Sequence, residues 1–131
     1  EAVSRKIPIV PIPGVTALTT VLPVSSFPLG SFYFGGFLSP KSGRRKNALK
    51  ELKEIKTVLA FYESPYRILK TLEDMKEVFG EETEVVIGRE MTKKFEEMIR
   101  GNLKDVTESN KFTVKGEFCI LVKNDLKERE E

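Results

Sequence analysis

The apolar residues of this 131-residue chain fall into two patterns, short continuous runs and runs with helical spacing. The continuous runs are bounded by Gly, Pro or charged residues, and they predict buried strands at residues 32–38, 57–62, 85–88 and 116–123. Apolar residues three and four positions apart predict helices at residues 15–26, 48–55, 68–79 and 102–110. A second apolar stretch at Met98 and Ile99 makes residues 85–101 a hairpin. Alternating strands and helices with one hairpin predict an α/β fold with a mixed sheet flanked by helices.

Local signals predict where these elements begin and end. Gly14 or Thr16 can cap the first helix, and Pro23 ends or kinks it. Ser64 followed by Pro65 is typical of a helix start. Gly80 is typical of a helix end, because glycine readily adopts the left-handed conformation found there.

The first residues predict a domain junction. Residues 7–12 (IPIVPI) predict a short strand at an edge, since three prolines in residues 8–13 do not suit a central strand. Residues 1–6 resemble the tail of a helix. We therefore expect residues 1–13 to be the remnant of an N-terminal domain and its linker, within a longer protein. Residues 14–123 then form a C-terminal domain, and residues 124–131 form a charged tail that frays.

Composition excludes several kinds of site. The chain has one Cys and no His, which argues against a zinc site, an internal disulfide and Ser-His or Cys-His catalysis. Cys119 lies in an apolar strand pattern and is expected to be a small core residue. No apolar run approaches the roughly 20 residues of a membrane helix. We expect a cytoplasmic protein that has no metal and no membrane partner.

Positive charge is concentrated at residues 40–56, although the net charge of the chain is only +2. Seven Lys or Arg residues face two Glu residues in this segment. Its first half reads as a Gly-containing loop that carries Lys41, Arg44 and Arg45, and arginine forks match phosphate oxygens. We predict that this loop contacts nucleic acid. The alternative is the wet side of an amphipathic helix.

A second charged segment follows the strand at residues 85–88, with six charged residues among residues 89–97. Glu63, Ser64 and Arg67 lie in the same way at the end of the strand at residues 57–62. Charged residues at the carboxyl ends of core strands meet at one edge of an α/β sheet and can line a cleft. Two alternatives are a solvated hairpin tip and a structural ion-pair network among Arg89, Glu90, Lys93 and Glu96.

Together these motifs resemble the class III S-adenosylmethionine-dependent methyltransferases, the tetrapyrrole-methylase-like family. Within that family the resemblance is to the branch that methylates ribosomal RNA, and it extends from about Val10 to Val122. It rests on five motifs: VPIPGVTAL (10–18), GFLSPKSGRR (36–45), FYESPYR (61–67), REMTKKFEEMIRG (89–101) and KGEF (115–118). PIPG followed by a small hydroxyl residue is shared widely in the superfamily. The third and fourth motifs, FYESPYR and REMTKKFEEMIRG at this separation, are much more specific to the RNA-methylating branch.

The resemblance implies a C-terminal domain of the tetrapyrrole methylase fold, in which S-adenosylmethionine lies in a cleft between two α/β domains. The family's first domain, with its Gly-rich loop, is missing from this sequence. Transferred by motif, the cofactor contacts are Thr16, Ala17, Tyr62, Met91, Gly116 and Glu117. Val15 stands where relatives often carry Pro, which leaves the turn before Thr16 less rigid.

The implied reaction is methyl transfer to the 2′-hydroxyl of a cytidine in 16S ribosomal RNA of the small subunit. A ribose hydroxyl is a poor acid, so a carboxylate near it should help, and Glu63, Glu90 and Glu96 are the candidates. Arg89 and Lys93 can bind phosphate or stabilise a developing alkoxide. The RNA contacts are expected at Lys41, Arg44, Arg45 and Arg67. The resemblance also implies a homodimer, and the present chain alone is expected to be inactive.

Two other functions remain open from the sequence. A small-molecule methylase of the tetrapyrrole branch would share the fold, although residues 89–97 and 40–46 argue against it. A non-catalytic RNA-binding module would need only the basic segment.

Overall fold

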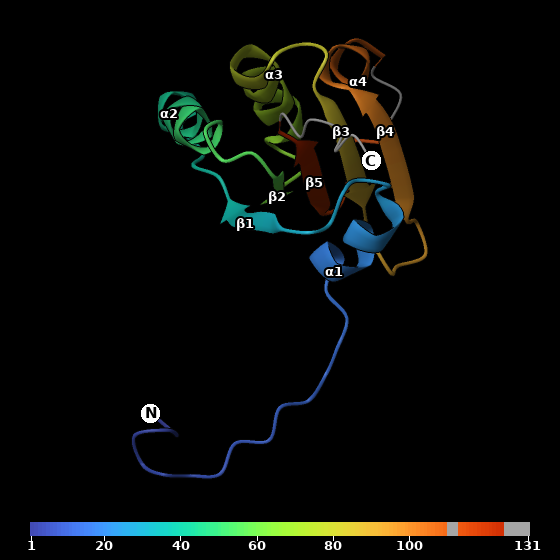
Figure 1. The fold of residues 1–131 in the computed structure, drawn as a ribbon. Helices are drawn as coiled ribbons and strands as arrows, with labels where there is room; N and C mark the ends of the chain where they lie inside the picture. The colour runs from blue at the N-terminus through green and yellow to red at the C-terminus, as the bar shows by residue number, and fades with distance from the viewer. Residues whose placement is uncertain (110–112, 125–131) are drawn as a thin grey trace.

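A five-stranded mixed sheet forms the centre of the molecule in the computed structural model, which describes residues 1–109 and 113–124 (Figure 1). The strand order is β1-β2-β5-β3-β4. The strands are β1 (Phe32–Phe37), β2 (Val58–Glu63), β3 (Glu84–Arg89), β4 (Glu97–Asn102) and β5 (Phe118–Lys123). The predicted α/β class with a mixed sheet is therefore confirmed.

The pairing of the strands creates one edge where several chain segments meet. β1 and β2 are parallel, whereas β5 is antiparallel to both β2 and β3. Strands β1, β2 and β3 thus run in the same direction, and we call the end where they finish the carboxyl edge. Glu63 and Arg89 both pair with Phe118, on its two sides. This confirms that the ends of these two strands lie at the same edge.

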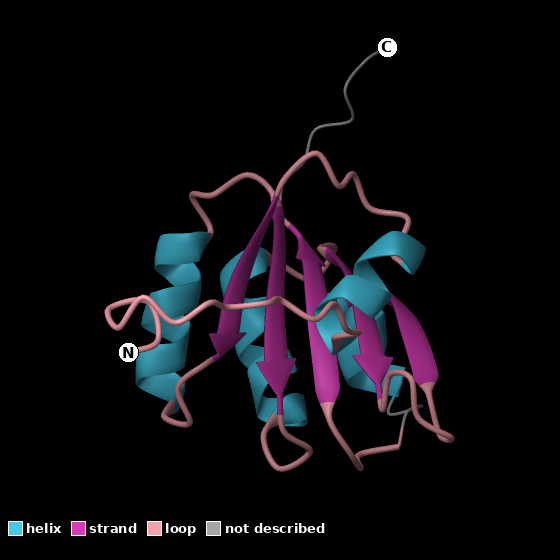
Figure 2. Ribbon diagram, turned by 90° about the horizontal axis from the view of Figure 1, so that it is seen from below, coloured by secondary structure: helices cyan, strands magenta, loops and turns pink. Residues whose placement is uncertain are grey.

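Helices cover the two faces of the sheet unequally (Figures 1 and 2). One face carries α2 (Ser42–Leu52), α3 (Ile68–Phe79) and α4 (Leu103–Ser109). The other carries only α1 (Ala17–Val21) and a 3-10 turn, η1 (Leu22–Val24). The first face is closed over, while on the second face β1 stays largely exposed.

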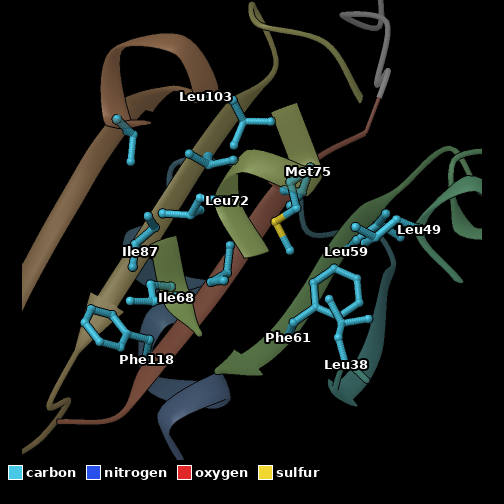
Figure 3. Close-up of a cluster of buried hydrophobic side chains, with 14 of the residues drawn as sticks. Leu38, Leu49, Leu59, Phe61, Ile68, Leu72, Met75, Ile87, Leu103 and Phe118 are labelled. Atoms are coloured by element: carbon cyan, nitrogen blue, oxygen red, sulfur yellow. The ribbon is translucent and has the colours of Figure 1, made fainter. Parts of the chain in front are cut away.

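Alternating residues of the same strands build the two cores, as a period of two requires. Leu59 and Phe61 of β2 pack with Leu72 and Met75 of α3 on one face (Figure 3). Val58 and Ala60 pack with Val21 of α1 on the other. Cys119 belongs to the second core, where burial raises the pKa of its thiol to about 12. It is a core residue, as expected.

Residues 1–13 differ from the prediction. Residues 7–12 form no strand and are exposed, because the prolines remove backbone donors and no described strand lies beside them. Residues 1–6 form a turn in which the Arg5 N–H donates to Glu1 O at 3.1 Å.

Two helix starts also differ from the prediction. The segment predicted as a basic loop begins α2 at Ser42, and the Arg45 N–H already donates to Lys41 O at 2.9 Å. Ser64 does not cap α3, which begins at Ile68. Residues 64–67 form a turn instead, in which Ser64 O accepts from the N–H groups of Arg67 and Ile68.

The ends of the remaining elements agree well with the sequence. Gly80 ends α3 with φ +105°, in a region that favours glycine. The predicted helix at residues 102–110 is α4, with residue 110 outside the described residues. The prediction that the fraying tail starts at residue 124 is wrong for Asn124, which is buried. Its amide donates to the carbonyls of Leu52, Lys53 and Ile55, at the end of α2 and beyond. The rest of that tail, residues 125–131, lies outside the described residues.

No helix in the described part of the chain is both long enough and apolar enough to cross a lipid bilayer.

Candidate active site

A pocket of about 330 Å³ opens at the carboxyl edge, beside the start of α1. Its walls come from five elements that are far apart in the sequence. The lining residues are Thr16, Ala17, Phe37, Tyr62, Glu63, Gly88, Met91, Glu117 and Phe118. The structure thus brings together five of the six residues predicted to contact a cofactor, and Gly116 is the exception.

Close approach of α1 to the sheet shapes one wall of this pocket. A Cβ atom on Gly88 would lie 2.6 Å from a methyl group of Val21 and 2.8 Å from the sulfur of Met91. Glycine is therefore needed where β3 passes under α1. Thr16 fixes the start of α1, because its Oγ1 accepts from the Thr19 N–H at 3.1 Å and Thr19 Oγ1 accepts from the Thr16 N–H at 3.3 Å.

Aromatic rings form the opposite wall. The hydroxyl of Tyr62 accepts from the Leu18 N–H at 3.4 Å, which joins the end of β2 to α1. The ring of Phe37 meets the Tyr62 ring edge-on, with the centroids 5.7 Å apart. These contacts hold the rings in place, so the pocket is preformed on its apolar side.

Gly116 supports the pocket without lining it. Its φ is +81°, and a Cβ atom there would lie 2.1 Å from Glu90 Oε1. The Glu90 carboxylate occupies this space in order to accept the Glu117 N–H at 2.7 Å. The Glu90 N–H donates to Glu117 O at 2.9 Å, so two hydrogen bonds tie the end of β3 to the start of β5.

Lys93 joins the same bridge from the hairpin loop. Its Nζ lies 3.4 Å from carboxylate oxygens of both Glu90 and Glu117. The Glu117 N–H, and secondarily Lys93, hold the pKa of Glu90 below its usual value. The carboxylates of Glu90 and then Glu117 raise the pKa of Lys93. Lys93 is thus a cation at neutral pH and not a proton acceptor.

Arg89 is buried at the helix-covered side of the same edge. Its Nε donates to Glu97 Oε2 at 2.9 Å across the hairpin, and its Nη1 donates to Lys115 O at 3.4 Å. The ion-pair network that the sequence left as an alternative is thus present only in part. Lys93 pairs with Glu90 and Glu117, Arg89 pairs separately with Glu97, and Glu96 forms no ion pair within the described residues.

Glu63 is buried and fully engaged. One carboxylate oxygen accepts from the Ser64 N–H at 2.8 Å and from Arg67 Nε at 3.2 Å, and the other accepts from Thr71 Oγ1 at 2.8 Å. This side chain holds the turn after β2 against α3.

The three carboxylates considered as proton acceptors differ in how much of each is free. Both oxygens of Glu63 and both oxygens of Glu90 already have partners. Glu96 Oε1 accepts from the Thr92 N–H at 3.2 Å, and its Oε2 has no hydrogen-bond partner among residues 1–109 and 113–124.

The basic residues at the start of α2 divide into two kinds. Lys41 and Arg44 are exposed and form no ion pair within the described residues. Arg45 is only 1% exposed, and its Nε donates to Asp74 Oδ2 of α3 at 2.7 Å. The prediction that Arg45 contacts RNA is therefore wrong, because its guanidinium is enclosed between two helices. Arg67 keeps part of its side chain in solvent.

Other residues important to the site were missed for identifiable reasons. Phe37 and Phe118 line the pocket, yet in the sequence they only mark strand ends. Glu97 could have been found, since a hairpin that pairs residue 89 with residue 97 brings an arginine opposite a glutamate. Asp74 gives no sequence signal for its pairing with Arg45.

The described residues contain no group of three or more His, Cys, Asp or Glu side chains that could hold a metal ion.

Comparison with known proteins gives sequence relatives over most of the chain. A family model described as tetrapyrrole (corrin/porphyrin) methylases matches residues 1–107. A ribosomal RNA small subunit methyltransferase I of Halalkalibacterium halodurans is 43% identical over 93% of this chain and 42% of the relative. The protein of that name from Bacillus subtilis is 39% identical over 87% of this chain and 39% of the relative. The chain thus spans about two fifths of the length of these two curated relatives.

Solved structures agree on the fold. The methyltransferase CobJ superimposes with a TM-score of 0.65 at 19% identity, covering 92% of this chain and 52% of CobJ. A Thermus thermophilus uroporphyrin-III C-methyltransferase, solved with S-adenosylhomocysteine, gives a TM-score of 0.58 at 16% identity, covering 92% of this chain and 55% of that one.

Proposed function

Since this chain belongs to the tetrapyrrole (corrin/porphyrin) methylase family, we propose that it forms part of an S-adenosylmethionine-dependent methyltransferase. The proposed substrate is the 2′-hydroxyl of a cytidine in 16S ribosomal RNA, within the small ribosomal subunit in the cytoplasm. The relatives that carry the name of a small-subunit RNA methyltransferase support this choice over a small-molecule methylase.

The observation that carries the proposal is the assembly of the pocket at the carboxyl edge. Phe37, Tyr62 and Phe118 offer apolar walls for a purine or thioether, while Thr16 and Glu117 offer polar groups at the rim. This mixture fits S-adenosylmethionine, which when bound supplies a methyl group on a positively charged sulfur. Gly116 and Glu90 would act indirectly, by fixing the position of Glu117.

The charged residues at the carboxyl edge take three roles in this proposal. Lys93, held as a cation beside Glu117, stabilises negative charge that develops on the ribose oxygen. Glu96 accepts the proton, because it alone among the three candidate carboxylates keeps an oxygen without a described partner. Glu63 and Arg89 position the loops that follow β2 and β3.

RNA binding is proposed for the cations that remain exposed. Lys41 and Arg44 lie at the start of α2, shortly after β1 reaches the carboxyl edge, and Arg67 lies in the turn after β2. Such residues suit phosphate contacts beside a pocket that holds the methyl donor. A non-catalytic RNA-binding module would not require that pocket.

A homodimer is also proposed. β1 is an edge strand, and on the face opposite α2 and α3 it exposes Phe32 and Phe34 by 45% and 44%. Burial of these rings by a second copy would remove an exposed apolar face. Sedimentation should then show a dimer at micromolar concentration, and a monomer at every concentration would contradict it.

Titration of the 131-residue chain with S-adenosylhomocysteine, followed by backbone amide NMR, tests the proposed function. Shifts should concentrate at Thr16, Met91 and Glu117. A second pocket, at the opposite end of the sheet around residues 80–84, is an internal control and should not respond. The cofactor proposal fails if no shifts occur at millimolar ligand, or if they concentrate at that second pocket.

A further inference from the structure

Two aromatic rings project into solvent at the carboxyl edge, one next to an arginine in the sequence and the other in contact with a lysine side chain. Tyr66 is 90% exposed and precedes Arg67. Phe95 is 67% exposed, and Lys94 Nζ lies 5.5 Å from the centre of its ring. A single exposed aromatic is ordinary on a protein surface, but two with neighbouring cations at one edge require a reason.

The two loops that carry these rings are fixed by carboxylates. Glu63 accepts from the Ser64 N–H and from Arg67 Nε, which holds the turn containing Tyr66. Glu96 accepts from the Thr92 N–H, which closes the loop containing Phe95. Neither exposed ring adds to the core. Because the loops are already ordered, they would lose little further conformational entropy when a partner binds the rings.

The loops that carry the rings begin on either side of Phe118, which lines the proposed cofactor pocket. The loops begin after Glu63 and after Arg89, and both of these residues pair with Phe118 between them. The starting points are therefore two strand spacings apart, about 10 Å. The pocket lies within this interval, since Tyr62, Phe118 and Met91 all line it.

We propose that Tyr66 and Phe95 stack on unpaired bases of single-stranded RNA, on the two sides of the nucleotide to be methylated; this inference rests on the proposed function. Every base has a flat face that can stack on an aromatic ring, and single-stranded RNA leaves that face free. Arg67 and Lys94 would contact the adjoining phosphates. A double helix would not satisfy this site, because its base faces are already stacked.

The chain contains no tryptophan, so the stacking can be observed directly. Single Tyr66→Trp and Phe95→Trp variants of the 131-residue chain each introduce one fluorophore at the proposed stacking position. A single-stranded RNA oligonucleotide with a fluorescent end label should quench either tryptophan over the same concentration range in which label anisotropy reports binding. Phe32→Trp is the matched control. Phe32 begins β1, at the end of the sheet opposite the carboxyl edge, so this tryptophan should remain unquenched.

Alanine variants give the corresponding affinities. Tyr66→Ala and Phe95→Ala should each weaken the single-strand complex about 10-fold, whereas Tyr66→Phe should bind as well as the original chain. The salt dependence of binding should stay the same in the aromatic variants, because no phosphate contact is lost. S-adenosylhomocysteine binding, measured on each variant, shows that the pocket is intact.

The inference is overturned if bound RNA quenches neither tryptophan, if a duplex quenches both equally, or if the chain binds no single-stranded RNA. In any of these cases, retained S-adenosylhomocysteine binding would show that the cofactor part of the proposed function still stands. If the unaltered chain bound no S-adenosylhomocysteine while RNA still quenched the tryptophan variants, only the proposed function would be overturned.

Discussion

The start of α2 and the hairpin between β3 and β4 are both rich in charged residues, and each contains one buried arginine. Residues 41–46 carry two Arg and two Lys, whereas residues 89–97 carry one Arg, two Lys and three Glu. Arg45 of α2 pairs with Asp74 on a neighbouring helix, whereas Arg89 pairs with Glu97 across its own hairpin. Neither arginine lines the pocket. The role of a charged residue is therefore decided by the element packed against it, and the local charge count does not reveal that element.

The largest effect is expected from Arg45→Ala. Removing one partner of a buried ion pair leaves the other charge uncompensated, so the free energy of unfolding should fall by about 3–5 kcal/mol. Arg44→Ala, one position away and exposed, should change it by less than about 0.5 kcal/mol. Urea unfolding of the two variants measures both values. Equal values for the two would show that the structure assigns the wrong arginine to the core.

The sequence predicted the edge of the site better than the contacts within it. Strand ends are marked by apolar runs, so it followed from alternation alone that Glu63 and Arg89 lie at one edge. The partner of Arg45 could not be predicted, because Asp74 is 29 residues away on another helix and carries no motif. The helix start at Ser42 was missed because Gly43 and three nearby cations resemble a loop in isolation. The pocket residues Thr16, Tyr62 and Met91 came from family resemblance and not from any pattern in the chain.

Gly116→Ala should be the next most damaging change. It should disturb the contact between Glu90 in the hairpin loop and Glu117 at the start of β5. The added methyl group would overlap the Glu90 carboxylate, and φ of +81° is strained for alanine. We expect a loss of about 1–3 kcal/mol together with weaker S-adenosylhomocysteine binding. Thermal unfolding and calorimetric titration provide the two measurements.

Gly43→Ala is the matched control, because nothing lies within 4 Å of its Cβ position in α2. It should be neutral or stabilising by up to about 1 kcal/mol. A second check uses Glu90→Ala, which removes the overlapping group and should reduce the cost of Gly116→Ala. Strict additivity of these two changes would contradict the proposed clash.

A dependence on pH should reveal the contact between Glu90 of the hairpin loop and Glu117. The pKa of Glu90 is lowered in the folded chain, so its contribution is complete above its usual value of 4.5 and disappears as the pH falls through the folded pKa. Protonation should loosen the contact between Glu90 and Glu117. NMR of the Glu117 amide from pH 6 to pH 2 should therefore show a transition below pH 4.5 that Glu90→Gln removes; a transition that persists in Glu90→Gln would assign it to another group.

The smallest effect on stability is expected from the double change Lys41→Ala and Arg44→Ala. Both side chains are exposed and unpaired within the described residues, so the unfolding curve should hardly move. RNA affinity should fall, and the slope of its log–log salt dependence should decrease by about one unit per lost phosphate contact. S-adenosylhomocysteine binding should stay unchanged. Unaltered RNA binding at every salt concentration would place the RNA-binding surface elsewhere, near Arg67 and the hairpin.

Methyl transfer to ribosomal RNA is the decisive test of the proposed function. This chain would replace the matching region of the Halalkalibacterium halodurans relative, and the chimera would be incubated with unmethylated small subunits and S-adenosylmethionine. Methylation of a 2′-hydroxyl protects the adjacent linkage from alkali, so we expect one gap in an alkaline ladder of 16S RNA, at a cytidine. Lys93→Met in the chimera should abolish the gap while cofactor binding remains. A folded chimera that binds cofactor and leaves the ladder complete, or that places the methyl group on a base, would contradict the account.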